Sequence, residues 1–330
     1  PFILGEQDRS KKFQIPQTLY GREHEISMLT TAFDRVSCGF TELMLISGYS
    51  GVGKSALVHE IQKAIVSRSG YFVTGKFDQF KRNIPYSSLI QALQELIRQL
   101  LTETEEQIQI WKQKILAAVG ANGHIIVDVI PEVELIIGRQ VAVPQLDATE
   151  AQNRFNLVFQ QFLSVFAQPE HPLVLFLDDL QWADSASLKL VQLLTTANDD
   201  LCLLLVGAYR DNEVSPTHLL MVILEEIRKV GLVVNEIWLQ PLLLTTVNQL
   251  VADALHCSLQ QCQALAELLW KKTDGNPFFL NQLLISLYEK QLLFFDSGTR
   301  CWQWDLAQIQ QVGMTDNVVE LMVSKLQGLP

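Results

Sequence analysis

Residues 46–57 read ISGYSGVGKSAL, a stretch whose residue types and spacing suit the binding of phosphate groups. Its glycines let the backbone turn tightly and aim several N–H groups at one point, and the helix expected next adds the positive end of its dipole. Lys54 supplies a charge for the outer phosphates of a nucleotide, and the Ser55 hydroxyl is placed to bind Mg²⁺. A glycine-rich turn with an incidental lysine is the alternative, but an apolar strand before the loop and a helix after it favour a phosphate-binding loop. The candidate nucleotide contacts here are Gly48, Ser50, Gly51, Val52, Gly53, Lys54, Ser55 and Ala56.

A pair of carboxylates follows another apolar run, LVLFLDDLQWAD at residues 173–184. Open α/β sheets bind their ligands at the carboxyl ends of the strands, where Asp178 and Asp179 would lie. Asp178 is the candidate ligand of a metal ion, directly or through water. Asp179 is the candidate that orients or deprotonates an attacking water. Turn and capping residues look the same, so the pair is informative only together with the phosphate loop; Asp184 we interpret as a helix N-cap.

Two further features suit a nucleotide site. Arg210 directly follows the apolar run LLLVGAY, where a cation can sense the outermost phosphate or stabilise developing charge. A surface ion pair, with Asp211 adjacent, is the alternative for this arginine. The sequence Gly275-Asn276-Pro277 is a turn between two predicted helices.

Lys76, Lys81 and Arg82 form a local basic cluster. We interpret it as a solvated face. A site for a regulatory partner or for the nucleotide of a second subunit is the alternative.

Apolar runs at 41–48, 70–77, 172–179, 201–210 and 232–242 predict strands that are buried on both faces. Helical patterns separate them, so the sequence predicts an α/β fold with a parallel sheet and right-handed crossovers. Amphipathic patterns from about 80 to 147 predict a helical insertion. A Phe-rich helix follows, and we interpret its stripe as core packing. After Pro241 the sequence predicts helices at 244–255, 258–272, 276–290 and 315–327, with a hairpin around Asp296-Ser297-Gly298 before the last of them.

The bulk composition excludes several classes of function. A net charge of −11 over 330 residues argues against a nucleic-acid coat or a protein that binds anionic membranes, so local groups must hold any nucleotide. No window approaches the roughly 20 apolar residues that span a bilayer. The five cysteines have no metal-site spacing, and we expect buried free thiols in a reduced, cytoplasmic protein. The chain begins at Pro1 without methionine, which predicts a piece of a longer protein.

With these residues in hand, the chain from Leu19 onward resembles the STAND class of AAA+-related ATPases, signal-transduction ATPases with numerous domains. LYGREHEISML resembles the entry helix of that class, which implies that Gly21 and Arg22 lie near the adenine. The resemblance assigns Asp178 to Mg²⁺, Asp179 to the water and Arg210 to a sensor role. Gly275-Asn276-Pro277 resembles the turn of a helical lid whose proline, Pro277, packs against the base. ATP, rather than GTP, is implied by this resemblance alone.

More narrowly, KFDQFKRNIPYSSLIQA and DDLQWADSASLKL are similar to the ATPase segment of large bacterial signalling proteins. In those proteins a serine/threonine kinase-like domain precedes the segment, and a sensor domain and a histidine kinase follow it. The resemblance implies that the partners are the flanking kinase and sensor domains, with a second copy of the chain as a further candidate. The sequence has no His-Arg-Asp loop and no Asp-Phe-Gly motif, so any kinase activity belongs to other parts of such a protein.

The resulting expectation is a P-loop NTPase. Residues 1–18 are a linker, 19–240 the ATPase core, 241–290 the helical lid and 291–330 the start of a winged-helix domain. We expect ATP or ADP and Mg²⁺ as cofactors, and a slow ATPase that acts as a switch, because Asp179 is one methylene shorter than the glutamate of many AAA+ hydrolases. A non-hydrolysing scaffold with a permanently bound nucleotide, or an interaction module, is the alternative, and a small-molecule phosphotransferase is disfavoured because the lid region has few arginines.

Overall fold

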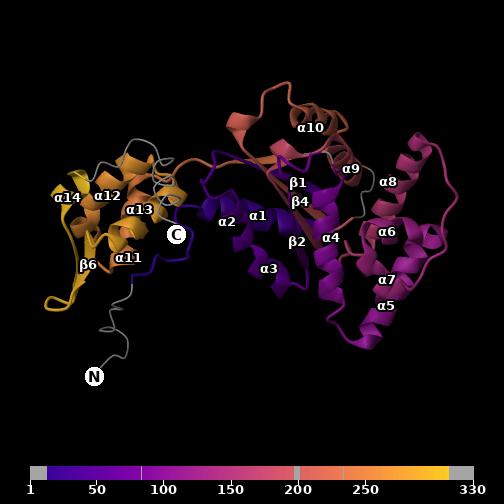
Figure 1. The fold of residues 1–330 in the computed structure, drawn as a ribbon, viewed down its shortest axis with the longest axis horizontal. Helices are drawn as coiled ribbons and strands as arrows, with labels where there is room; N and C mark the ends of the chain where they lie inside the picture. Colours follow the sequence, from indigo (N-terminus) through magenta and orange to yellow (C-terminus); the bar gives the residue numbers. More distant parts are fainter. Residues whose placement is uncertain (1–12, 83, 197–200, 233, 312–330) are drawn as a thin grey trace. The chain divides into compact units, whose positions relative to one another are not determined.

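A computed structural model describes residues 13–82, 84–196, 201–232 and 234–311 of the chain (Figure 1). These residues form two compact units. The larger unit contains Glu25–Tyr49 and Lys54–Trp238. The smaller unit contains the N-terminal residues up to His24, the short stretch Ser50–Gly53, and the residues from Leu239 onward.

The larger unit is built on a five-stranded sheet in which every described pairing is parallel, with the strand order β2-β3-β4-β1-β5. All five predicted strands are confirmed, and they are β1 (Glu42–Ser47), β2 (Tyr71–Lys76), β3 (Leu173–Asp178), β4 (Leu203–Tyr209) and β5 (Val234–Trp238). Their register pairs Lys76 with Asp178 and Ser47 with Tyr209, so the strands end at a common edge. The candidate site residues that follow β1, β3 and β4 therefore meet at this edge.

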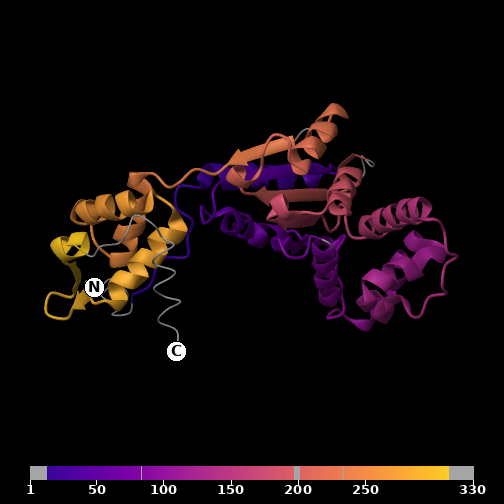
Figure 2. The same cartoon turned by 45° about the horizontal axis from the view of Figure 1, so that its top comes forward.

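Helices cover both faces of the sheet (Figures 1 and 2). Odd-numbered strand residues such as Leu175 and Leu205 belong to one buried cluster with α4, α8, α9 and α10. Even-numbered residues point to the opposite face, where His59 of α2 packs edge-on against Phe72 and Phe176. This two-sided burial explains why the strands read as continuous apolar runs. The bounds are α1 (Glu23–Val36), α2 (Lys54–Glu60), α3 (Gln62–Ser67), α9 (Ser185–Thr196) and α10 (Leu219–Lys229).

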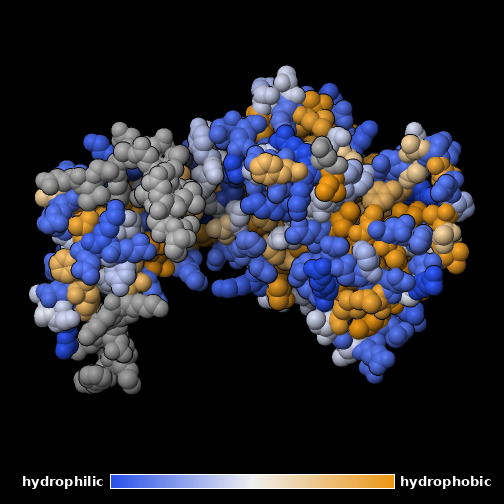
Figure 3. Space-filling view, in the orientation of Figure 1, coloured by the Kyte–Doolittle hydropathy of each residue, from blue (hydrophilic) through white to orange (hydrophobic). Residues whose placement is uncertain are grey.

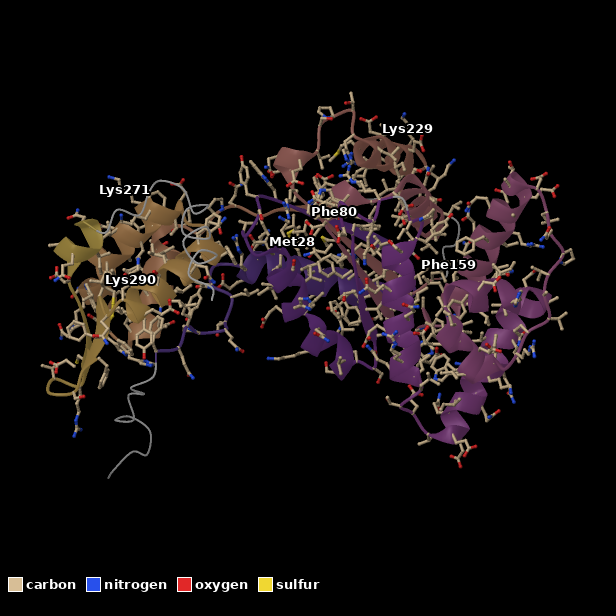
Figure 4. The ribbon with its side chains drawn as sticks, in the orientation of Figure 1. Met28, Phe80, Phe159, Lys229, Lys271 and Lys290 are labelled. Atoms are coloured by element: carbon tan, nitrogen blue, oxygen red, sulfur yellow. A yellow bond between two sulfur atoms is a disulfide. The ribbon has the colours of Figure 1, made fainter. Side chains whose placement is uncertain are left out.

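The predicted helical insertion lies between β2 and β3. Its elements are α4 (Ser87–Leu100), α5 (Glu105–Val119), the 3-10 turn η1 (Gly120–Asn122), α6 (Gly123–Val129), η2 (Pro131–Val133) and α7 (Glu134–Ile137). The predicted Phe-rich helix, α8 (Ala148–Ser164), follows the insertion and leads to β3. The Phe-rich stripe of α8 is core packing, as predicted, because Phe159 and Phe162 are fully buried. Phe159 is labelled in Figure 4. Gly75 lets α4 approach β2 closely, since a Cβ there would lie 2.4 Å from the carbonyl oxygen of Ser88.

The smaller unit contains the three helices predicted after Pro241 and the predicted hairpin. They are α11 (Leu244–Leu255), α12 (Leu259–Thr273), α13 (Pro277–Glu289), β6 (Leu293–Asp296) and β7 (Cys301–Trp304), followed by a short helix α14 (Leu306–Gln311) that the sequence analysis did not predict. Leu265, Leu284 and Trp302 belong to one apolar core. The predicted helix at 315–327 lies outside the described residues, as do residues 1–12 of the predicted linker and 312–330 of the predicted winged-helix start.

The expectation of buried free thiols holds only for Cys202 among the five cysteines. Cys257 and Cys262 form a disulfide with Cα atoms 6.7 Å apart. Cys257 follows the end of α11 and Cys262 lies in the first turns of α12, so the tight connection brings them together. Of the others, Cys202 is a buried free thiol, Cys301 is partly buried and Cys38 is exposed.

The face shown in Figure 3 carries hydrophilic residues with apolar patches among them. Leu135 and Val141 of the insertion and Leu157 of α8 are among the exposed apolar side chains. Within the described ranges, each helix is too short or too polar to cross a membrane.

Candidate functional site

The loop after β1 has the backbone of a phosphate cradle. Its three glycines adopt positive φ angles, 148° at Gly48, 78° at Gly51 and 105° at Gly53. Glycine takes such angles without steric cost, whereas other residues would be strained. The strand–loop–helix order that the motif requires is present, with β1 ending at Ser47 and α2 beginning at Lys54.

The Lys54 side chain folds back onto the phosphate loop. Its Nζ donates hydrogen bonds to the carbonyl oxygens of Gly48 at 2.7 Å and Tyr49 at 2.9 Å, and the residue is only 7% exposed. Burial lowers the pKa of Lys54, and the negative charge of Asp178 partly opposes that shift. A buried ammonium held by two carbonyls is a fixed positive charge for an anionic ligand.

Ser55 and Asp178 meet at the edge of the sheet. The Ser55 hydroxyl donates to Asp178 Oδ2 at 2.8 Å, and Asp178 Oδ1 accepts the backbone N–H of Asp179 at 2.9 Å. Across the described part of the chain, no group of three or more His, Cys, Asp or Glu side chains gathers as a metal site. One hydroxyl and one carboxylate nevertheless fit Mg²⁺, which usually takes one or two carboxylates and fills its other positions with water and phosphate oxygens.

Asp179 has an unusual backbone and a crowded carboxylate. Its φ and ψ are 56° and 44°, the left-handed region that non-glycine residues seldom occupy. The side chain is buried beside two cations, with Lys76 Nζ 3.3 Å from Oδ2 and Arg210 Nε 3.4 Å from Oδ1. Gln181 Nε2 donates to Oδ1 at 2.9 Å. The predicted acid is therefore present at the site and restrained on three sides.

Arg210 points toward this acid. Its other partner is Glu213, 2.7 Å from the guanidinium, and it stacks over the Trp182 ring at 4.8 Å. Asp211, the neighbour considered in the sequence analysis, instead accepts a hydrogen bond from Trp238 Nε1 at 3.2 Å. The arginine is thus a member of the candidate site and also of a surface ion pair.

The basic cluster is not simply a solvated face. Lys76 is 68% exposed but contacts Asp179, and Arg82 donates to the carbonyl oxygen of Gln181 at 3.1 Å. Lys81 lines a groove of about 720 Å³ together with Lys76 and Trp182. Sequence reasoning missed Lys76 and Gln181 as neighbours of the acid, because only the pairing of β2 with β3 and the turn after β3 bring them there.

All of the remaining predicted contacts except Ala56 belong to the smaller unit. Gly21, with φ 62°, lies against the Thr246 side chain, and the buried Arg22 donates to the carbonyl oxygen of Gln240 at 2.5 Å. Ser50 is exposed, and so is Ala56 of the larger unit. The carbonyl oxygen of Val52 lies 3.4 Å from the Arg22 guanidinium.

The predicted turn at Gly275-Asn276-Pro277 also lies in the smaller unit, where it contacts the stretch Ser50–Gly53. Asn276 Nδ2 donates to the carbonyl oxygen of Ser50 at 2.9 Å, and its Oδ1 accepts the N–H of Phe278 at 3.1 Å as the cap of α13. A Cβ on Gly53 would lie 4.0 Å from the Pro277 ring. The predicted N-cap at Asp184 is confirmed by a 2.8 Å hydrogen bond from the N–H of Ser187.

Comparison with known proteins identifies a matching family model and sequence relatives of this chain. The family model of the AAA ATPase domain matches residues 18–206. Hybrid signal transduction histidine kinase G of Dictyostelium discoideum is 32% identical, aligned over 99% of this chain and 11% of that protein. Histidine protein kinase 1 of Candida albicans is 25% identical over 54% of this chain and 8% of that protein. The peroxide stress-activated histidine kinase mak3 of Schizosaccharomyces pombe is 20% identical over 91% of this chain and 16% of that protein. The chain therefore spans a small part of the length of each relative.

Solved structures agree on the fold. The Cdc6p protein of Pyrobaculum aerophilum has a TM-score of 0.50 and 12% identity, covering 84% of this chain and 64% of that one. The ORC2 protein of Aeropyrum pernix, solved in ADPNP-ADP complexes, has a TM-score of 0.51 and 11% identity, covering 96% of this chain and 73% of that one. At these identities the likeness concerns the fold alone, and it supports the parallel α/β architecture described above.

Proposed function

Because the chain belongs to the AAA ATPase domain family, we propose that it binds ATP with Mg²⁺ and hydrolyses it slowly, as a nucleotide-controlled switch within a longer signalling protein. The observation that carries the proposal is the hydrogen bond between Ser55 and Asp178, next to the buried ammonium of Lys54. Together they supply the cation, the hydroxyl and the carboxylate that a Mg²⁺-nucleotide needs from a protein.

In this proposal the loop glycines present backbone N–H groups to the phosphates, and Lys54 neutralises charge on the outer two. Ser55 and Asp178 hold Mg²⁺, which supplies charge neutralisation when bound. Gly21, Arg22 and Pro277 are the proposed contacts of the adenine, on the resemblance to STAND ATPases. The observed positive φ angles and the packing of Pro277 near Gly53 support these assignments.

We expect slow hydrolysis because of the contacts and the length of the Asp179 side chain. A carboxylate acts on an attacking water only if it reaches it. The Asp179 carboxylate is paired with the cations of Lys76 and Arg210, and aspartate is one methylene shorter than glutamate. Both features reduce the fraction of time in which Asp179 can accept a proton from water, which suits a switch better than a motor.

A signalling context is supported by the relatives, which are named histidine kinases and are much longer than this chain. We propose that flanking kinase and sensor domains are the partners and that the assembly is cytoplasmic. We further propose that residues 19–240 are the ATPase core, 241–290 a lid that responds to the nucleotide, and the residues from 291 the start of a winged-helix domain.

The test measures ATP affinity and turnover of the 330-residue chain. Lys54→Ala should weaken ATP binding by at least about tenfold, which is the scale of one charged contact. Lys63→Ala, an exposed lysine on α3, is the matched control and should bind as the unsubstituted chain does. Unchanged binding in Lys54→Ala would contradict the proposal. Bound ADP that never exchanges would favour a scaffold with a structural nucleotide.

A further inference from the structure

Gln181 is a buried amide whose two polar ends are both used at the candidate site. Its Nε2 donates to Asp179 Oδ1 at 2.9 Å, and its Oε1 accepts the backbone N–H of Arg210 at 3.2 Å. The residue is only 2% exposed. One side chain thus joins the acid that follows β3 to the backbone at the end of the neighbouring strand β4.

Among the three side chains that approach the Asp179 carboxylate, Gln181 makes the shortest and most buried contact. The cations lie farther away, at 3.3 Å for Lys76 and 3.4 Å for Arg210. The Lys76 side chain is 68% exposed and that of Arg210 is 25% exposed, so solvent competes with both. A buried hydrogen bond is the stiffer restraint, because water cannot replace either partner.

The backbone of Asp179 needs such a restraint. The left-handed conformation is unfavourable for aspartate and persists only where its surroundings hold it. Gln181 lies two residues later in the 3-10 turn η3 (Leu180–Trp182), and Arg82 fixes the same turn by donating to the Gln181 carbonyl oxygen. The turn is therefore anchored at its backbone and at its side chain.

We propose that Gln181 is a positioning residue for ATP hydrolysis, holding the Asp179 carboxylate in register with the end of β4 that carries Arg210. This role rests on the proposed ATPase function. The amide serves both contacts at every pH, since it donates from nitrogen while it accepts at oxygen. Leucine offers neither group, and an ionised glutamate can accept but cannot donate.

The experiment compares Gln181→Leu, Gln181→Glu and the control Gln192→Leu for ATP hydrolysis from pH 6 to pH 8. Gln192 also donates its amide to a carboxylate, Glu226, at 3.1 Å, but on the exposed surface. Gln181→Leu should lower kcat about tenfold or more at every pH while KM for ATP changes less than about threefold. Gln192→Leu should match the unsubstituted chain.

Gln181→Glu distinguishes positioning from folding. The introduced carboxyl would lie where Gln181 Nε2 now lies, beside the Asp179 carboxylate, and burial against a like charge makes a carboxyl hold its proton to higher pH. When protonated it donates as the amide does, and when ionised it repels Asp179. The rate relative to the unsubstituted chain should therefore rise as the pH falls from 8 to 6.

Two outcomes would overturn the role of Gln181 while leaving the ATPase intact, namely a kcat within twofold of normal for Gln181→Leu or a pH-independent rate ratio for Gln181→Glu. If Gln181→Leu does not fold, the pH dependence of Gln181→Glu still decides. An unsubstituted chain that hydrolyses no ATP would overturn the proposed function, and the role of Gln181 with it.

Discussion

The Ser55 hydroxyl donates to the Asp178 carboxylate at 2.8 Å, although the two residues are 123 positions apart in the chain. The contact exists because β1 and β3 both pair with β4 and end at the same edge of the parallel sheet. Each residue follows or ends a strand, so the topology alone places hydroxyl and carboxylate side by side.

Replacing Ser55 tests whether this pair serves a metal. Ser55→Ala removes one oxygen ligand and should weaken ATP binding about tenfold when Mg²⁺ is present and much less when it is chelated. The measurement is ATP affinity with and without a chelator. Ser67→Ala is the control, because Ser67 donates only to a carbonyl of its own helix. A loss of the same size with and without Mg²⁺ would contradict the metal role.

The pKa of Lys54 predicts a pH dependence of ATP binding. Burial lowers this pKa below the ordinary 10.5, so the ammonium loses its proton at a lower pH than an exposed lysine would. ATP affinity should therefore begin to fall below pH 10.5 as the pH rises. Lys54→Met has no proton to lose, and its weaker binding should not change over the same range.

The same shift affects stability with a defined sign. The folded state holds the Lys54 proton less tightly than the unfolded state does, so the free energy of unfolding should rise with pH between the folded pKa and 10.5. Lys54→Met should lack this rise in urea unfolding. An identical pH dependence in both proteins would show that the ammonium is not desolvated in solution.

Asn276 combines two roles that two substitutions can separate. Asn276→Ala removes the cap of α13 and should lower the free energy of unfolding by about 1 kcal/mol. Asn276→Asp keeps the capping oxygen but cannot donate to the Ser50 carbonyl, and it adds negative charge beside the phosphate loop. It should retain the contribution of the cap to stability and weaken ATP binding.

Ser258→Ala is the matched control for Asn276, since Ser258 caps α12 in the same unit through Gln261. It should cost similar stability and leave ATP binding unchanged. Equal ATP binding in Asn276→Asp and the unsubstituted chain would show that Asn276 acts only as a cap.

Much of this architecture could be predicted from local patterns. Strands buried on both faces read as apolar runs, and the helix cap at Asp184 is specified by neighbouring residues. The phosphate loop and the aspartate pair are likewise local in sequence. Their proximity could be predicted because parallel sheets bind ligands at the carboxyl ends of their strands, whatever the order of the strands.

The surroundings of Asp179 could not be predicted in this way. Lys76 reaches the acid because β2 is the neighbour of β3, and the sequence did not predict that order. Gln181 looks like an ordinary polar residue before a helix, and only the left-handed turn at Asp179 directs its amide inward. The disulfide was not predicted because Cys257 and Cys262 are five residues apart across the boundary between two helices. That sequence separation does not fix the distance between the two side chains.

The central claim, that this chain binds ATP and uses Asp179 to hydrolyse it slowly, is tested most directly by single-turnover phosphate release. The protein is held in excess over ATP and Mg²⁺ is present, so that release reports the chemical step. The account predicts slow release from the unsubstituted chain, and for Asp179→Asn normal ATP binding with release slowed at least about 100-fold. Release from Asp179→Asn at the unsubstituted rate, or no ATP binding by the unsubstituted chain, would contradict it.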